Sequence, residues 1–153
     1  VIAVRKESGK VVWHAGPDVV AQQHTPVELE NGTILVFDNG NLRPGVTSPH
    51  STVLEFDPHT QAIHWQYRDI FPPAFFSPYM GSAQRLTNGN TFICESAFGR
   101  LFEVTPQGET VWEYIIPYFN EYPAHLSQGI IPGKQNSAFR AHRYSANDIF
   151  WLK

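Results

Sequence analysis

The strongest constraint on the fold is a repeated pair of short apolar segments joined by an Asn-Gly dipeptide. The first pair covers residues 27–36 and the second covers residues 84–93, and their dipeptides begin at Asn31 and Asn88, 57 positions apart. An Asn-Gly dipeptide between apolar runs is typical of a two-residue type I′ turn, in which both turn residues have positive φ. Each pair therefore predicts a tight β-hairpin.

A second strand pair follows each hairpin, at residues 53–67 and 101–114. A tryptophan recurs at the same place in the repeat, as Trp13, Trp65 and Trp112, with spacings of 52 and 47 positions. Four strands in roughly every 40–50 residues are typical of a β-propeller blade. We therefore expect the three tryptophans to lie in the core between neighbouring blades.

The repeats predict an all-β fold, a partial β-propeller made of four-stranded antiparallel blades. Residues 1–14 would end one blade, residues 22–67 and 81–114 would form two more, and residues 123–153 would form an irregular tail with a candidate closing strand at 139–144. Complete propellers have about four to eight blades. We therefore expect the missing blades to come from upstream sequence or from other chains, because open sheet edges otherwise stay unpaired.

The composition excludes several classes of function. The formal net charge of −3 gives no reason to expect nucleic-acid binding. No apolar stretch reaches the roughly 20 residues that span a bilayer, so no transmembrane segment is expected. Cys94 is the single cysteine and no histidine pair has the spacing of a zinc-binding helix, so we expect neither an internal disulfide nor a metal site. The chain begins with Val1, which indicates a processed or truncated N-terminus.

Several short motifs occur in a fixed order along the chain. They are Gln23-His24-Thr25, Phe37-Asp38-Asn39-Gly40, Val53-Leu54-Glu55-Phe56-Asp57, Trp65-Gln66-Tyr67 and Phe139-Arg140-Ala141. Taken together, over about residues 13–144, they resemble the bacterial arylsulfotransferase family. The resemblance implies a six-bladed propeller with its site at the central channel, and transfer of a sulfuryl group from an aryl sulfate to a phenolic acceptor. It also implies that no cofactor takes part, and that the protein is periplasmic or secreted.

The resemblance assigns the catalytic role to His24. In members of the family that have been studied, the histidine of the Gln-His motif becomes sulfated, and this position is His24 here. Neutral imidazole is nucleophilic near pH 7, and a hydrogen bond to its other nitrogen can hold the ring. We expect His24 just before the innermost strand of a blade, near the mouth of a channel. The residues alone also fit a histidine that caps a strand at a turn.

Three further candidates for substrate-binding residues accompany His24. Arg43 lies in a long loop and Arg85 in the inner-strand position of the second unit. Either could bind an anionic substrate, because sulfuryl transfer needs cationic or N–H groups around the transferred oxygens. Arg43 could instead be a solvated loop charge, and Arg85 could form a salt bridge to a neighbouring blade. Asp38, together with Asn39, either orients His24 or closes a turn.

More than one function fits these residues. The first is an aryl-sulfate sulfotransferase; the two further histidines and the arginine of the family's site lie upstream of the Gln-His motif and have no counterpart here, so we expect the chain alone to be inactive. The second is a non-catalytic propeller that serves as a scaffold or interaction module of a larger assembly. The aromatic residues between positions 69 and 80 would form either a lid over a phenolic ligand or a contact with a partner. A third reading is a redox protein that stacks a quinone on a tryptophan.

Overall fold

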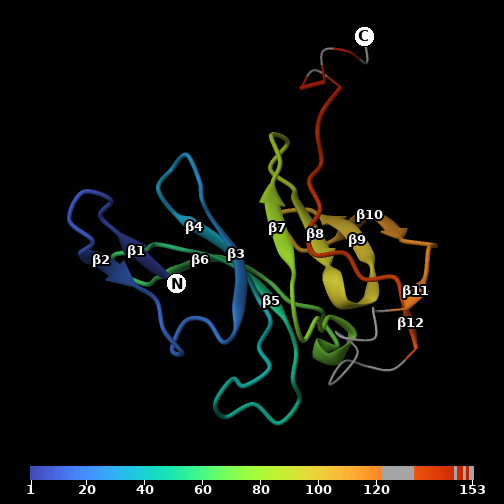
Figure 1. Ribbon diagram of the computed structural model, residues 1–153, viewed down its shortest axis with the longest axis horizontal. Helices are drawn as coiled ribbons and strands as arrows, with labels where there is room; N and C mark the ends of the chain where they lie inside the picture. Colours follow the sequence, from blue (N-terminus) through green and yellow to red (C-terminus); the bar gives the residue numbers. More distant parts are fainter. Residues whose placement is uncertain (122–132, 147, 150, 152–153) are drawn as a thin grey trace.

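Two four-stranded antiparallel sheets form the body of the computed structural model, which describes residues 1–121, 133–146, 148–149 and 151 (Figure 1). The first sheet contains, in this order, β3 (Gln23–Glu28), β4 (Ile34–Asp38), β5 (Thr52–Phe56) and β6 (Ile63–Tyr67). The second contains β7 (Ser82–Arg85), β8 (Thr91–Glu95), β9 (Arg100–Val104) and β10 (Thr110–Ile115). Within each sheet, strands that are consecutive in the sequence pair with each other. The predicted all-β fold with four-stranded antiparallel units is confirmed.

Shorter elements lie before, between and after the strands of the two sheets. They are the paired strands β1 (Ile2–Val4) and β2 (Val11–His14), the paired strands β11 (Asn120–Glu121) and β12 (Lys134–Gln135), and the 3-10 turns η1 (Pro72–Ala74) and η2 (Ser96–Phe98). No helix in the described part of the chain is long and apolar enough to cross a membrane.

The hairpin turns differ from the predicted type. A three-residue loop joins β3 to β4: the amide of Leu29 donates to the carbonyl of Thr33 at 2.8 Å, and the amide of Gly32 donates to the carbonyl of Leu29 at 2.8 Å. Gly32 has a φ of 81°, whereas Asn31 keeps a negative φ. The side-chain oxygen of Asn31 accepts a hydrogen bond from the amide of Thr33, which favours this conformation. The turn between β7 and β8 has the same bonding pattern. The type I′ prediction is therefore wrong, and each turn ends instead in a left-handed glycine.

An apolar layer fills the space between the two sheets. Its buried members are Leu35, Phe37, Val53, Tyr67, Phe75, Ala83, Ile93, Phe102 and Val104. Phe75 comes from the connection between the sheets and is fully buried. Its ring packs edge-on against Phe37, Tyr67 and Phe102, with centroids 5.3 to 5.6 Å apart. Phe75 is therefore a core residue, neither a lid nor a contact with a partner.

A second apolar cluster covers the opposite face of the first sheet. It joins side chains of β4 and β5 to residues that follow β2, namely Ile34, Val36, Leu54, Phe56, Ala15, Val19 and Val20. Trp13 packs against this cluster, with its ring 6.5 Å from that of Phe56, and Trp65 packs against the layer between the sheets. These two tryptophans are partly buried and pack against the core, close to the predicted position. Trp112 does not lie in the core, because 41% of it remains exposed.

A salt bridge crosses the boundary between the two sheets. Nη2 of Arg85 on β7 lies 2.7 Å from Oε2 of Glu55 on β5, and the guanidinium lies 4.6 Å from the ring centroid of Trp65. Thr33 and Asn31 also donate hydrogen bonds to Glu55. Burial acts to raise the pKa of Glu55, but these two hydrogen bonds and the charge of Arg85 outweigh it and lower the pKa.

Arg143 repeats this arrangement on the second sheet. It pairs with Glu103 of β9, and its guanidinium lies 5.4 Å from the ring centroid of Trp112. Asn88 and Asn90 donate hydrogen bonds to the same carboxylate. The C-terminal segment therefore docks on the second sheet with the same ionic contact that β7 makes with the first.

The candidate closing strand at 139–144 is not a strand in the structure. Its backbone forms hydrogen bonds with side chains of β7 and not with the backbone of a neighbouring strand. The hydroxyl of Ser82 bonds to the backbone of Ala141, and the side-chain amide of Gln84 bonds to the backbone N–H and carbonyl of Arg143. Side chains project from the face of a sheet, so the segment runs alongside β7 over this face rather than extending the sheet at its edge. Residues 123–132 of the predicted tail lie outside the described residues.

Replacing Phe75 with alanine is expected to destabilise the protein by about 3–5 kcal/mol, because the substitution leaves a cavity in the middle of the apolar layer. Urea unfolding followed by tryptophan fluorescence measures the change. Phe71→Ala is the matched control, since Phe71 lies in the same connection and is 67% exposed. Equal losses of stability in the two variants would contradict the position given to Phe75.

Glu55→Gln is expected to lower the free energy of unfolding by about 1–3 kcal/mol at neutral pH, because glutamine cannot form the charged hydrogen bond to Arg85. The pKa of Glu55 is lowered by folding, so its contribution is present above the usual value of 4.5 and is lost as the pH falls through the folded value. The stability difference between wild type and variant should therefore shrink in acid.

Urea unfolding at a series of pH values, from neutral to a pH of about 3, measures this difference. Glu113→Gln is the control: Glu113 pairs with Arg100, but 47% of its side chain is exposed, so its loss should change stability little. A wild-type advantage that grows as the pH falls would show that the sign is wrong.

Candidate functional site

His24 lies near the start of β3 and is half-buried. The backbone around it is irregular, because Gln22 and Thr25 have φ values of 61° and 51°, in the left-handed region that disfavours residues with a side chain. The pairing of β3 with β4 also shifts register between His24 and Val27. Irregular backbone of this kind is concentrated at functional sites. It marks the surroundings of His24 as the candidate site.

The imidazole of His24 is held by Asn39, the first residue after β4. Nδ1 of His24 lies 2.6 Å from Oδ1 of Asn39, which is fully buried. The side-chain nitrogen of Asn39 donates two hydrogen bonds, to the carbonyl of Ser77 at 2.7 Å and to the carbonyl of Met80 at 2.6 Å. Asn39 thus connects the first sheet, the histidine and the chain that leads into the second sheet.

The connecting residues 77–81 form a fixed support below this cluster. The amide of Ser77 donates to Oγ of Ser51, and Oγ of Ser77 accepts a hydrogen bond from the amide of Ala97. Oγ1 of Thr25 donates to the carbonyl of Gly81 at 2.5 Å. Gly81 has a φ of 126°, and a Cβ there would overlap the ring of Phe37, so this approach of backbone to ring requires glycine.

Asp38 precedes Asn39 and serves a different set of partners. It is fully buried and accepts hydrogen bonds from the amide of Ala21 at 2.7 Å and from Thr52, and it pairs with Arg43. Burial raises the pKa of Asp38, although these hydrogen bonds and the charge of Arg43 oppose the rise. Of the two residues considered for orienting the histidine, Asn39 makes the contact. Asp38 instead binds Ala21, which precedes β3, and Arg43 and Thr52, which follow β4.

The two arginines considered for anion binding lie at different ends of the strands. Arg43 belongs to the His24 end through its pair with Asp38, and 22% of its side chain is exposed. Arg85 is the last residue of β7. The first residue of this strand, Ser82, closely follows Met80, whose carbonyl accepts a hydrogen bond from Asn39, so Arg85 lies at the far end of the strand. It forms the salt bridge between the sheets. The structure therefore groups the other predicted site residues with Asn39 and leaves Arg85 apart.

Glu95 is a buried acid near this site that the sequence analysis did not single out. Its Oε1 accepts a hydrogen bond from the amide of Phe76, and its Oε2 pairs with Arg100 at 3.3 Å. Burial raises its pKa, although both partners act in the opposite direction. Glu95 attaches the residues before Ser77 to the second sheet. No sequence signal indicated this role, because its partner is the backbone of a distant loop.

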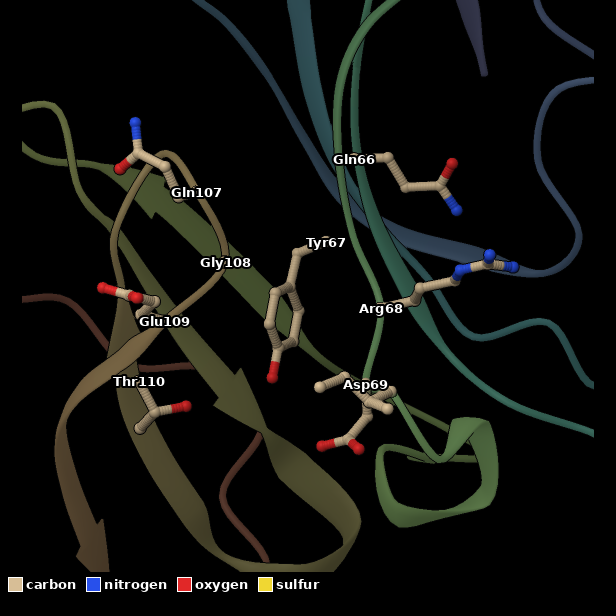
Figure 2. A pocket seen from close by; sticks show the side chains of 9 residues that line it. Gln66, Tyr67, Arg68, Asp69, Gln107, Gly108, Glu109 and Thr110 are labelled. Atoms are coloured by element: carbon tan, nitrogen blue, oxygen red, sulfur yellow. The ribbon is translucent and has the colours of Figure 1, made fainter.

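A pocket of about 670 Å³ lies between residues 66–70, which include the end of β6, and residues 107–110, which lead into β10 (Figure 2). The ring of Tyr67 stands in the middle of its lining, and its hydroxyl points toward Thr110 (Figure 2). Burial raises the pKa of Tyr67, and the charge of Asp69 adds to this effect. β6 and β10 are the last strands of their sheets, whereas β3 is a first strand, so the pocket is separate from the His24 cluster.

The arrangement around His24 supports nucleophilic or acid–base chemistry of the imidazole. One ring nitrogen is engaged by a buried partner, and the residue is only partly buried. Within residues 1–121, 133–146, 148–149 and 151, no group of three or more His, Cys, Asp or Glu side chains is placed to hold a metal ion.

Comparison with solved structures finds a crystal structure of a protein of unknown function from Bacteroides caccae, with a TM-score of 0.49 and 18% sequence identity. The match covers 73% of this chain and 37% of that one, so the chain spans little more than a third of the other protein's length. No curated protein matches the sequence.

Comparison with protein families gives a match over most of the chain. The sequence model described as arylsulfotransferase (ASST) matches residues 1–116. This range contains His24, Asn39 and Arg43, and also both four-stranded sheets up to the end of β10. The chain belongs to the arylsulfotransferase (ASST) family.

Proposed function

We propose that this chain carries the sulfate-accepting histidine of an aryl-sulfate sulfotransferase, and that this residue is His24. The observation that carries the proposal is the placement of its ring, which is half-buried and held through Nδ1 by a fully buried asparagine. A ring held at one nitrogen can present the other to a substrate. Family membership supplies the substrate class, an aryl sulfate as donor and a phenol as acceptor.

The reaction consists of two displacements at sulfur. A nitrogen lone pair of His24 forms an N–S bond while the bond from sulfur to the aryl oxygen breaks, and the phenolate leaves with the electron pair and takes a proton from solvent. The oxygen of a second phenol then attacks the same sulfur and loses its proton to solvent. The N–S bond breaks, and the lone pair returns to the imidazole.

Charge on the sulfuryl oxygens must be balanced during both displacements. Arg43 is the cation tied into the His24 cluster, and the part of its guanidinium that Asp38 leaves uncovered is available to an anion. The additional histidines and arginine that the family resemblance implies have no counterpart in this chain. We therefore assign the activity to the complete protein rather than to these 153 residues alone.

We also propose that the two sheets are neighbouring blades of an incomplete β-propeller. Two features support this: the first strands β3 and β7 lie side by side (Figure 1), and the Arg–Glu–Trp contact between the sheets is repeated by Arg143. His24 then lies on the innermost strand of its blade. X-ray scattering by the complete protein should give the profile of a compact disc, and the profile of an elongated stack would contradict the ring.

The second candidate function is a non-catalytic interaction module. Its support is the large number of exposed apolar side chains on the outer parts of the described chain, namely Ile2, Val4, Val11, Val12, Val111, Trp112, Tyr114 and Ile115. Exposed apolar surfaces of this kind mark contacts with other protein segments. In the proposed ring, neighbouring blades would cover the same surface.

Reaction with an aryl sulfate separates the two functions. The complete protein is incubated with 4-nitrophenyl sulfate without an acceptor, and its intact mass is measured. The proposal predicts a gain of one SO₃ unit per chain, which maps to the peptide containing His24 and disappears when a phenol is added.

The His24→Ala variant should show no such gain. His64→Ala is the matched control, because His64 is exposed on β6 of the same sheet and should leave the adduct unchanged. An unmodified wild-type protein would overturn the enzymatic proposal in favour of the interaction module, and an adduct that survives in His24→Ala would overturn the assignment of the sulfate-accepting role to His24.

A further inference from the structure

We propose that Asn39 is the positioning residue that fixes the proton of His24 on Nδ1 and leaves the lone pair of Nε2 to form the bond to sulfur. The role of Nε2 in sulfate transfer rests on the proposed function, whereas the assignment of the hydrogen to Nδ1 does not. It follows from the bonding of one buried amide.

The orientation of the Asn39 amide is determined by its backbone partners. Its nitrogen lies 2.7 Å from the carbonyl oxygen of Ser77 and 2.6 Å from that of Met80. A carbonyl oxygen only accepts hydrogen bonds, and an amide NH₂ group has two hydrogens to donate. Exchanging the oxygen and nitrogen of Asn39 would place its oxygen against two other oxygens, so the observed orientation is the one that satisfies all three groups.

The fixed amide in turn determines the tautomer of the histidine. Oδ1 of Asn39 faces Nδ1 of His24 at 2.6 Å, and this oxygen can only accept. Nδ1 must therefore carry the hydrogen. Neutral imidazole has one protonated and one unprotonated nitrogen, so Nε2 keeps its lone pair.

The same hydrogen bond favours the sulfated form of the histidine over the free form. When the lone pair of Nε2 forms the bond to sulfur and the phenolate departs, the ring gains positive charge while Nδ1 keeps its hydrogen. The bond from Nδ1 to Asn39 then has a charged donor, which strengthens it. A hydrogen bond that is stronger to the charged ring than to the neutral ring lowers the barrier to formation of the charged, sulfated ring.

Asn41 provides a matched control. It lies two residues further along the same loop, and its side-chain nitrogen donates to the carbonyl of Pro78, in the same connecting segment that Asn39 binds. Its side-chain oxygen is buried without a hydrogen-bond partner and so makes no bond to His24. Asn41→Ala removes a comparable loop contact and leaves the histidine's partner in place.

The first test is nitrogen NMR of histidine-labelled protein without substrate. In the wild type and in Asn41→Ala, the His24 resonances should show a hydrogen on Nδ1 and none on Nε2 at neutral pH. In Asn39→Ala, the form with hydrogen on Nε2 should become populated. A hydrogen on Nε2 in the wild type would overturn the role of Asn39 whatever the activity.

The second test is the rate of sulfate transfer from 4-nitrophenyl sulfate to the protein. Asn39→Ala should slow it on the order of 100-fold or more, because the wrong tautomer has no lone pair at the reacting nitrogen, while Asn41→Ala should stay within a few-fold of the wild type. Thermal unfolding of both variants shows whether each is folded.

Asn39→Asp provides a readout that loss of structure would not produce. Its carboxylate still accepts from Nδ1 and stabilises the charged ring, so the low-pH limb of the rate profile should move to higher pH. An unmoved pH profile in a folded Asn39→Asp protein, or a wild-type rate in Asn39→Ala, would contradict the proposal. If Nδ1 carries the hydrogen but the wild type forms no adduct, the proposed function fails and the tautomer assignment stands.

Discussion

The apolar layer between the two sheets is the interaction on which the rest of the structure depends. Phe75 enters this layer from the connection between the sheets, and its burial fixes the residues that follow it. The carbonyls of Ser77 and Met80 consequently lie below the end of β4, where the side chain of Asn39 binds both. The position of the His24 ring is therefore set by the same packing that holds the sheets together.

This dependence explains why so many polar groups are buried around the site. Burying a carboxylate or an amide costs free energy unless its hydrogen bonds are replaced. Asp38, Asn39 and Glu95 each bind backbone groups of neighbouring segments, and each closes a gap between a strand end and a loop. The result is a hydrogen-bonded support for a partly buried histidine, which is the arrangement that the proposed covalent intermediate requires.

The sequence predicted the all-β fold and its strand pairs well, because alternating apolar residues and turn dipeptides are local signals. The four-stranded units and the packing of Trp13 and Trp65 against the core follow from them. The turn type was wrong because the side chain of Asn31 bonds to the backbone and keeps its φ negative. The prediction of a closing strand at 139–144 was wrong, because this segment bonds to side chains of β7 and not to the backbone of β7.

The candidate site was only partly predictable for a different reason. His24 came from a short motif, and Asn39 was considered only together with Asp38 as a residue that orients the histidine or closes a turn. Their separate roles depend on which partner each side chain meets, and those partners lie about 40 residues away for Asn39 and 17 away for the Ala21 amide that Asp38 binds. Phe75 and Glu95 were missed as supports because their contacts join segments of different sheets.

The most direct test of the account is an experimental structure of the complete protein after reaction with an aryl sulfate in the absence of an acceptor. The account predicts a sulfuryl group bonded to Nε2 of His24, with Nδ1 still within hydrogen-bonding distance of Oδ1 of Asn39. A sulfuryl group on Nδ1 or on another residue would contradict it.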